Sequence, residues 1–232
     1  MKIKLKLGEN IYRYKFIPIY PGIKRINKEI AFENLLLLKK ICEENHIPFL
    51  LYYGTLLGAV REKDFITHDE DIDLALKKED MPIFLNLLFK LRNIGFEVAR
   101  YERRGFMSII RKGEYIDLYF FDIYPQNRNW RYCARDIFPK DFIEETKKID
   151  FKGELFSTCS NPIKFLEFYY GENWKTPIAF FDFNMSKITK LKLFSSQYIK
   201  MLLPRSIVEH LQNKRDMKYL SLQKSKIKQC GH

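Results

Sequence analysis

Asp71 and Asp73 stand two positions apart at the start of a short alternating segment, and this pair constrains the fold more than any other feature. Apolar and polar residues alternate over residues 72–77, which predicts a β-strand whose side chains share a face at every second position. Both carboxylates should therefore leave one face, where they repel by about 3 kcal/mol at an effective dielectric of about 20. A divalent cation such as Mg²⁺ offsets this repulsion and shares its coordination shell with substrate phosphates. Solvated acids at a strand edge are the alternative interpretation.

The turn at Gly54 and Thr55, about sixteen residues before Asp71, supplies the second half of a phosphate site. Gly54 ends a short buried run, and a helix is expected to begin there and to continue to Arg61. The free N–H groups of a helix start bind phosphate through hydrogen bonds and the helix dipole. Thr55 could cap this helix or bind a phosphate oxygen itself, and the two roles are compatible. A phosphate-binding turn followed by an Asp-x-Asp pair is typical of phosphoryl transfer.

A third carboxylate, Asp117, is expected from a neighbouring strand. It stands in the middle of the apolar and aromatic run 115–121, and an unpaired carboxylate is costly to bury. Asp117 therefore needs a cation, a metal or the role of a base, and we predict a second-metal ligand and a general base for an acceptor hydroxyl. A structural ion pair with an arginine such as Arg111 is the alternative. Asp122, at the end of the same strand, is the weaker candidate for the third carboxylate.

Three motifs together resemble one protein family. Residues 53–61 read Tyr-Gly-Thr-Leu-Leu-Gly-Ala-Val-Arg, residues 69–74 read Asp-Glu-Asp-Ile-Asp-Leu, and residues 116–118 read Ile-Asp-Leu. They resemble the LicD family, whose nucleotidyltransferase core is shared by fukutin and fukutin-related protein. The resemblance is specific over about residues 50–76 and looser up to about residue 178, where the segments 151–153 and 169–177 are similar to later family motifs. The first twenty residues and the tail after about residue 186 are not covered.

The resemblance implies a nucleotidyltransferase-like α+β fold and a metal-dependent phosphotransferase. Such an enzyme would move phosphocholine, or a similar phospho-alcohol, from a CDP-linked donor to a hydroxyl of a cell-surface glycan or glycolipid, as in lipopolysaccharide or capsule biosynthesis. Two ions of Mg²⁺ or Mn²⁺ would assist it. The catalytic metal ligands would be Asp71, Asp73 and Asp117, and the groups facing the donor phosphates would be Gly54, Thr55 and Arg61.

Four further residues are candidates for the donor pocket, namely His68, Asp69, Tyr170 and Trp174. His68 replaces the aromatic residue that the family usually carries before its run of acids, and this departure could alter the pocket. His68 could act as a base near the metals, although packing is the more common role. Tyr170 and Trp174 could line a cage for a quaternary ammonium group through cation–π contacts. Aromatic residues near a helix end more often belong to the core, and Arg61 could equally be a surface arginine.

The order of apolar patterns predicts an α+β fold with a mixed sheet flanked by helices. The expected elements are two strands around a turn at 8–10, a helix at 24–45, strands at 47–53 and 72–76, a helix at 79–93, a meander of strands at 96–101, 106–111 and 115–121, a strand at 149–157, a helix at 162–170 and a helical tail from 187 that is broken at Pro204. We predict three regions, an N-terminal β element at 1–23, a catalytic domain at 24–185 and a basic helical tail at 186–232.

The net charge of +12 is concentrated at the two ends of the chain. Residues 1–28 hold eight Lys or Arg against one acid, and residues 187–228 hold eleven against two. Basic ends suit anionic lipid head groups, while a solvated tail, or a tail packed on the main domain, fits as well, and nucleic acid is the least favoured partner. Since no signal peptide and no apolar run of about 18 residues is present, we expect a cytoplasmic protein, with peripheral contact at the inner face of the membrane. The scattered Cys and His residues predict neither a zinc site nor disulfides.

Two other functions fit parts of the sequence. One is a nucleotidyltransferase acting on a nucleic acid or a small-molecule hydroxyl, and the other is a non-catalytic module that binds membrane or nucleic acid. The extended motif similarity favours the phosphotransferase over both. The sequence leaves open which phospho-alcohol is carried, which glycan accepts it and the oligomeric state.

Overall fold

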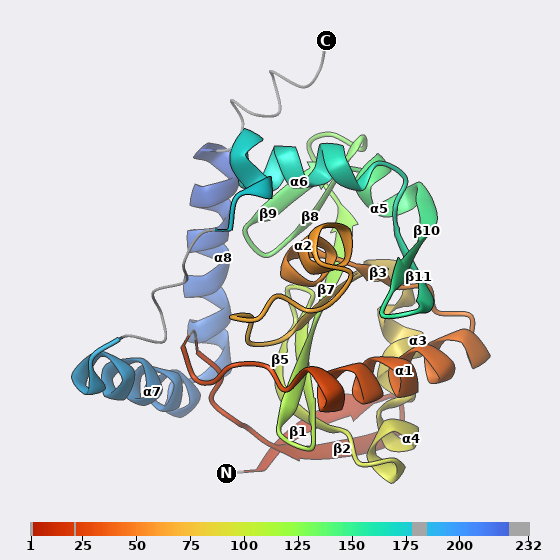
Figure 1. Ribbon diagram of the computed structural model, residues 1–232. Helices are drawn as coiled ribbons and strands as arrows, with labels where there is room; N and C mark the ends of the chain where they lie inside the picture. Colours follow the sequence, from red (N-terminus) through yellow and green to blue (C-terminus); the bar gives the residue numbers. More distant parts are fainter. Residues whose placement is uncertain (1, 21, 178–184, 223–232) are drawn as a thin grey trace.

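The computed structural model describes residues 2–20, 22–177 and 185–222, and a mixed β-sheet lies at its centre (Figure 1). The strands of this sheet are β3 (Leu50–Leu51), β4 (Ile72–Lys77), β5 (Glu97–Glu102), β6 (Phe106–Arg111), β7 (Glu114–Ile123), β8 (Trp130–Cys133) and β9 (Asp136–Pro139). They lie in the order β3-β4-β7-β6-β5, with β8 and β9 continuing from β7. Strands β4 and β7 are parallel, and the other neighbouring pairs are antiparallel.

Two hairpins and a set of helices surround this sheet. The hairpins are β1 (Lys2–Leu7) with β2 (Asn10–Lys15), and β10 (Thr146–Phe151) with β11 (Glu154–Cys159). The helices are α1 (Lys28–Glu44), α2 (Tyr53–Arg61), α3 (Met81–Asn86), α4 (Leu88–Asn93), α5 (Asp141–Glu144), α6 (Pro162–Tyr170), α7 (Lys187–Leu202) and α8 (Arg205–Leu222), with short 3₁₀ turns at Lys78–Asp80 and Glu172–Lys175. The predicted class, a mixed sheet flanked by helices, is confirmed.

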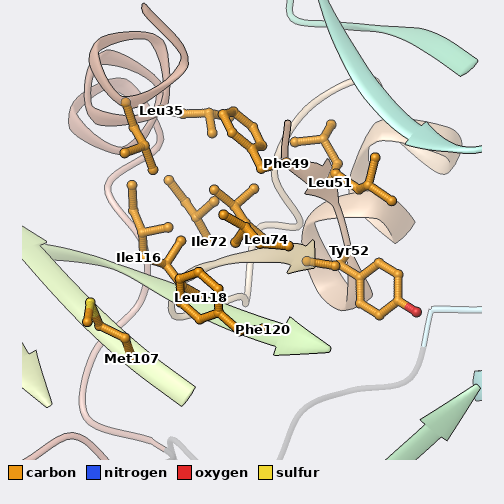
Figure 2. Close-up of a cluster of buried hydrophobic side chains, with 14 of the residues drawn as sticks. Leu35, Phe49, Leu51, Tyr52, Ile72, Leu74, Met107, Ile116, Leu118 and Phe120 are labelled. Atoms are coloured by element: carbon orange, nitrogen blue, oxygen red, sulfur yellow. The ribbon is translucent and has the colours of Figure 1, made fainter. Parts of the chain in front are cut away.

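The central strands have one apolar face and one face that carries acids. Figure 2 shows the apolar face, where Ile72, Leu74, Ile116 and Leu118 meet Leu35 of α1, and all five are fully buried. Each side chain of this size contributes about 1.5–3 kcal/mol when it leaves water, so this face holds the sheet against α1. Side chains alternate along a strand, so the intervening positions must face the other side of the sheet. Asp73 of β4 and Asp117 of β7 are among them.

Several predicted elements are confirmed. The meander appears as β5, β6 and β7, helix α6 covers the predicted residues 162–170, and the N-terminal pair of strands is β1 and β2. The tail forms α7 and α8 on either side of Pro204, as expected. Helix α1 begins at Lys28, later than predicted, because Asn27 caps it by accepting the backbone N–H of Ile30 at 3.1 Å.

Three predicted elements were wrong in extent or number. The strand expected at 149–157 is a hairpin, since Lys152 and Gly153 both have positive φ (57° and 83°), which a two-residue turn of type I′ requires. The helix expected at 79–93 is divided into a 3₁₀ turn, α3 and α4, with Pro82 starting α3. The strand expected at 47–53 shrinks to β3, and β8, β9 and α5 had not been predicted.

Both ends of the described chain pack on the central domain. Leu7, Tyr12 and Tyr14 of the N-terminal hairpin belong to the main hydrophobic core. Helix α8 is tied down by its buried Asp216, which accepts two hydrogen bonds from Arg104 at 2.6 and 2.8 Å. None of the helices in the described ranges combines the length and apolar character needed to cross a membrane. The three-region boundaries predicted above stay predictions.

Candidate active site

A row of polar residues crosses four strands on the face opposite the apolar core. The register places Asp73 of β4 beside Asp117 of β7, Asp117 beside Ser108 of β6, and Ser108 beside Arg100 of β5. Side chains at paired positions of neighbouring strands point to the same side of a sheet, so the four groups form one line. The sequence predicted Asp117 as a third carboxylate on a strand neighbouring Asp73, and the parallel β4–β7 contact places it there, while Asp71 lies just before β4.

Asp117 is held at both carboxylate oxygens. The Ser108 hydroxyl donates to its Oδ1, and the Arg100 guanidinium donates from Nη2 to its Oδ2 at 3.3 Å. Arg100 also donates to the Ser108 hydroxyl at 3.2 Å. The cation beside Asp117 is therefore Arg100, and the alternative partner Arg111 binds Glu33 instead at 2.9 Å.

Asp73 is held by groups of the turn that precedes β4. The N–H of Gly54, at the start of α2, donates to Asp73 Oδ2 at 3.2 Å, and the Asp73 N–H donates to the Thr55 hydroxyl at 2.9 Å. A carboxylate at a helix start is favoured by the same dipole that favours phosphate. The predicted helix start thus lies against the acid pair, and its Gly54 N–H is engaged by Asp73.

The prediction that Thr55 faces a phosphate needs correction. Its side chain is fully buried and does not line the cavity described below. Helix α2 begins at Tyr53, so Thr55 is not its N-cap residue either. Its hydroxyl instead fixes the backbone of β4 at Asp73. Thr55 is a positioning residue in this structure.

Asp69 lies directly against Gly54, so any larger residue at position 54 would displace the Asp69 carboxylate. A Cβ placed on Gly54 would come within 2.6 Å of Asp69 Oδ2. That oxygen is buried and has no hydrogen-bond partner among the described residues. A buried acceptor without a donor is costly, so Asp69 Oδ2 is a position where a ligand group can bind.

The acids on this face raise one another's pKa values. Burial raises the pKa of Asp69 to about 7, while the Glu70 backbone N–H lowers it and the charge of Glu70 raises it. Burial also raises the pKa of Asp71 well above its usual range, and Asp73 and Asp117 raise it further. The pKa of Asp73 is raised in the same way, first by burial and then by Asp69 and Asp117. Burial raises the pKa of Asp117, while Arg100 and the Ser108 hydrogen bond lower it.

A cavity of about 630 Å³ opens over this row. The predicted site residues that line it are Gly54, Arg61, His68, Asp69, Asp71, Asp117, Tyr170 and Trp174. Asp73 lies just outside the lining, bound to the α2 start. Asp122 does not line the cavity, because it stands an odd number of positions from Asp117 on β7 and faces the other side. The structure therefore favours Asp117 as the third carboxylate.

Two buried donors in the cavity wall lack acceptors among the described residues. Arg61 donates from Nη2 to Glu62 at 2.6 Å, but its buried Nε has no partner. The indole Nε1 of Trp174 is likewise buried without a partner. Arg61 lines the cavity, and an unpaired guanidinium donor suits a phosphate oxygen. For Trp174, the ammonium group of Lys175 already stands over the ring at 5.6 Å, so a quaternary ammonium cage stays a prediction.

Sequence reasoning missed three residues of this site. Arg100 lines the cavity and neutralises Asp117, and Tyr20 and Tyr115 also line it. An arginine in an amphipathic edge strand gives no signal in a single sequence, since only the register reveals its neighbour. Glu70, which follows Asp69, has a structural role, because its carboxylate accepts the backbone N–H groups of Gly22 and Ile23 at 2.6 and 3.2 Å. These bonds hold the N-terminal segment beside the site.

The acid set has the chemistry that a hard divalent cation requires. Within residues 2–20, 22–177 and 185–222, no group of three or more His, Cys, Asp or Glu side chains is placed to hold a metal ion. Mg²⁺ commonly needs only one or two carboxylates, because water and substrate phosphates complete its shell. Asp71 and Asp73 fit this, since neither has an ion pair in the described part of the chain. Asp117 as a third ligand stays a prediction, because Ser108 and Arg100 occupy its oxygens here.

Comparison with known families identifies the family of this chain. A sequence model described as LicD/FKTN/FKRP, nucleotidyltransferase domain, matches residues 46–161, which is half of the chain. This chain belongs to the LicD family. The matched range contains the Gly54 turn, Asp71, Asp73 and all of β7, so the LicD resemblance drawn from the motifs is confirmed.

Individual relatives are more distant. Lipopolysaccharide cholinephosphotransferase LicD of Haemophilus influenzae is 38% identical over 50 residues, which cover 22% of this chain and 19% of that protein. Ribitol-5-phosphate transferase FKTN of Macaca fascicularis is 25% identical over 171 residues, which cover 68% of this chain and 36% of that protein. The chain spans about half the length of other curated relatives that it matches, 42% and 58% in two of them. Among solved structures, the antibiotic-resistance factor ANT(2'')-Ia has a TM-score of 0.48 at 15% identity and covers 85% of this chain and 97% of that one.

Proposed function

We propose that this LicD-family chain is a phosphotransferase that moves a phospho-alcohol, such as phosphocholine, from a CDP-linked donor to a hydroxyl of a cell-surface glycan, with Mg²⁺ or Mn²⁺ as cofactor. The observation that carries the proposal is one cavity lined both by an excess of carboxylates and by Arg61, whose buried Nε is unpaired among the described residues. Carboxylates suit cations and the arginine suits phosphate, and a phosphodiester donor with its metal satisfies both. Two named relatives, a cholinephosphotransferase and a ribitol-5-phosphate transferase, support this substrate class.

In the proposed reaction, the acceptor hydroxyl oxygen attacks the phosphorus that bears the alcohol. A new O–P bond forms, the P–O bond to the nucleotide breaks, and CMP leaves with the bonding electrons. Asp117 accepts the proton of the attacking hydroxyl, and Ser108 and Arg100 orient its carboxylate. Arg61 binds a phosphate oxygen through its Nε. Divalent ions held by Asp71 and Asp73 would supply positive charge to the donor phosphates.

The direct test measures CMP release from labelled CDP-choline, CDP-ethanolamine, CDP-glycerol and CDP-ribitol by the purified chain, with and without Mg²⁺ or Mn²⁺. We expect metal-dependent release from at least one donor, lost on adding a chelator. Asp71→Asn should lower the rate by at least about 10³-fold, because the cation contributes several kcal/mol to the transition state. Asp122→Asn is the matched control and should keep the wild-type rate, since Asp122 faces away from the cavity.

Three outcomes would count against the proposal. Pyrophosphate release from nucleoside triphosphates, with no CMP release from any CDP-alcohol, would indicate a nucleotidyltransferase instead. Equal rates for wild type and Asp71→Asn would remove the acid pair from the mechanism. If neither nucleotide nor metal raised the temperature of thermal unfolding, a non-catalytic binding module would be favoured.

A further inference from the structure

Helix α7 carries an apolar stripe that the rest of the described chain leaves uncovered. The side chains of Ile188, Leu191, Ile199 and Leu202 are 68%, 63%, 58% and 79% exposed. At 3.6 residues per turn they lie within about 80° of one another around the helix axis. Ser195 lies between the two apolar pairs on this side of the helix. Exposed apolar side chains gathered on one helix side mark a surface that binds something.

The side of α7 that fixes the helix to the protein adjoins the Leu191 edge of the stripe, since Tyr198 and Phe194 lie about 20° and 60° from Leu191 around the helix axis. Phe194 lies against Tyr20 with ring centroids 6.5 Å apart, and Tyr198 lies against Phe16 at 6.3 Å. Both contacts are edge-on and join α7 to the segment that follows the N-terminal hairpin. The helix lies at the edge of the molecule, at the lower left of Figure 1. The apolar stripe is therefore presented outward by a helix that is already anchored.

The charge of α7 indicates what covers the stripe. The helix contains four lysines and no acid, and Lys187 and Lys192 are exposed beside the stripe. An apolar stripe flanked by lysines is the pattern of a helix that lies in the interface of an anionic bilayer. A second copy of this chain fits less well, because it would bring the lysines of two chains with a net charge of +12 each against one another.

We propose that α7 binds the surface of an anionic phospholipid bilayer through Ile188, Leu191, Ile199 and Leu202, with Lys187 and Lys192 contacting the head groups. The helix lies flat, its stripe enters the head-group region, and Phe194 and Tyr198 keep it attached to the domain. This lipid contact is independent of the catalytic assignment.

The position of α7 would bring the proposed bilayer contact close to the active-site cavity. Tyr20, which touches Phe194, also lines the cavity above the acids. A bilayer bound at α7 would therefore lie close to the cavity, where an acceptor carried on a lipid could present its hydroxyl. This last step rests on the proposed phosphotransfer, whereas lipid binding does not and is measured without substrate.

The experiment is co-sedimentation of the full chain with vesicles of phosphatidylcholine alone and of phosphatidylcholine mixed with phosphatidylglycerol. We expect binding to the anionic vesicles only, weakened by added salt. The double variant Ile188→Gln/Leu202→Gln should bind at least about tenfold more weakly, because two apolar side chains no longer enter the bilayer. Lys187→Gln and Lys192→Gln should each weaken binding about fivefold.

The matched control is Ile83→Gln/Leu155→Gln. It removes two apolar side chains that are 50% and 57% exposed on α3 and β11, away from α7, and it should bind like wild type. Absence of wild-type binding to anionic vesicles, or equal loss in the α7 and control variants, would overturn the proposal. So would a dimer in sedimentation equilibrium that the α7 variant dissociates, since the stripe would then be an interface between copies. Circular dichroism of each variant shows that the helix content is retained.

Discussion

Asp73 and Asp117 are register partners on adjacent parallel strands, yet different kinds of group surround their two carboxylates. Around Asp73 the described residues supply uncharged donors, the Gly54 N–H and the Tyr119 hydroxyl. Around Asp117 they supply a cation, Arg100, and the Ser108 hydroxyl. On the β4 side burial and neighbouring acids raise the pKa of Asp73, so its charged form needs a cation from outside, whereas on the β7 side Arg100 already offsets the charge of Asp117. This difference suits a metal ligand on β4 and a positioned base on β7.

The largest expected effect comes from Asp117→Asn, which tests whether Asp117 acts as the base. The amide keeps the shape of the side chain but cannot take a proton, so we expect the rate of transfer to fall about 10²–10⁴-fold, the range for loss of a general base. The measurement is CMP release with the donor that wild type prefers, together with the affinity for Mn²⁺. If Asp117 is the base, the affinity for Mn²⁺ should change little.

Asp122→Asn serves as the control on the same strand, because that side chain accepts a hydrogen bond from the neighbouring Ile123 N–H and faces away from the cavity. A rate for Asp117→Asn within about threefold of wild type would end its assignment as base. A large loss of Mn²⁺ affinity would instead make Asp117 a metal ligand like the β4 acids.

The sequence was sufficient for the parts of the site that are local in the chain. The alternation around Asp73, the Gly54 turn and the buried acid Asp117 each carry their own pattern, and Asp117 was expected on a strand neighbouring Asp73, where the register places it. Asp71 lies just before β4, so the shared face expected for Asp71 and Asp73 stays a prediction. The groups that bind these acids are set by tertiary contacts and could not be predicted from the sequence. Arg100 is brought to Asp117 by the order of three antiparallel strands, while Arg111, nearer in sequence to Asp117, turns to Glu33.

Thr55 is a second residue whose tertiary contact the sequence does not determine. A threonine after a glycine at a helix start is compatible with a cap, a phosphate ligand or a structural hydroxyl, and one sequence does not separate them. The fold separates them because α2 begins earlier, at Tyr53, and this turns the hydroxyl of Thr55 toward β4. The β10–β11 hairpin was missed for a similar reason, since Lys152 adopts a positive φ that its residue type rarely shows.

A second variant tests the hydrogen bond that holds Asp73 of β4 to Thr55. Thr55→Val keeps the shape but removes the acceptor of the Asp73 N–H, so a buried donor is left unpaired. We expect the free energy of unfolding to fall by about 1–3 kcal/mol, measured by urea denaturation. Thr55→Ser, which keeps the hydroxyl and loses a methyl group, should cost about 1 kcal/mol. Equal destabilisation in both variants would mean that packing, not the hydrogen bond, holds the turn to β4.

The smallest expected effect, and the most specific, comes from Arg100→Gln on the β7 side. A base works only when deprotonated, so the rate falls on the acid side of its pKa. Burial raises the pKa of Asp117 and Arg100 lowers it, so removing the guanidinium should raise that pKa again. The acid limb of the kcat/KM profile should then move to higher pH, with the rate at high pH less affected.

Arg100→Lys is the control for charge, since it keeps a cation beside Asp117 and should leave the acid limb near its wild-type position. If the glutamine variant lost activity equally at every pH, Arg100 would act by binding substrate or by holding the shape of the cavity that it lines, and the β7 side would not be tuned for proton transfer. A shift in the opposite direction would be incompatible with Asp117 as the base, because no loss of a neighbouring positive charge makes a carboxylate easier to deprotonate.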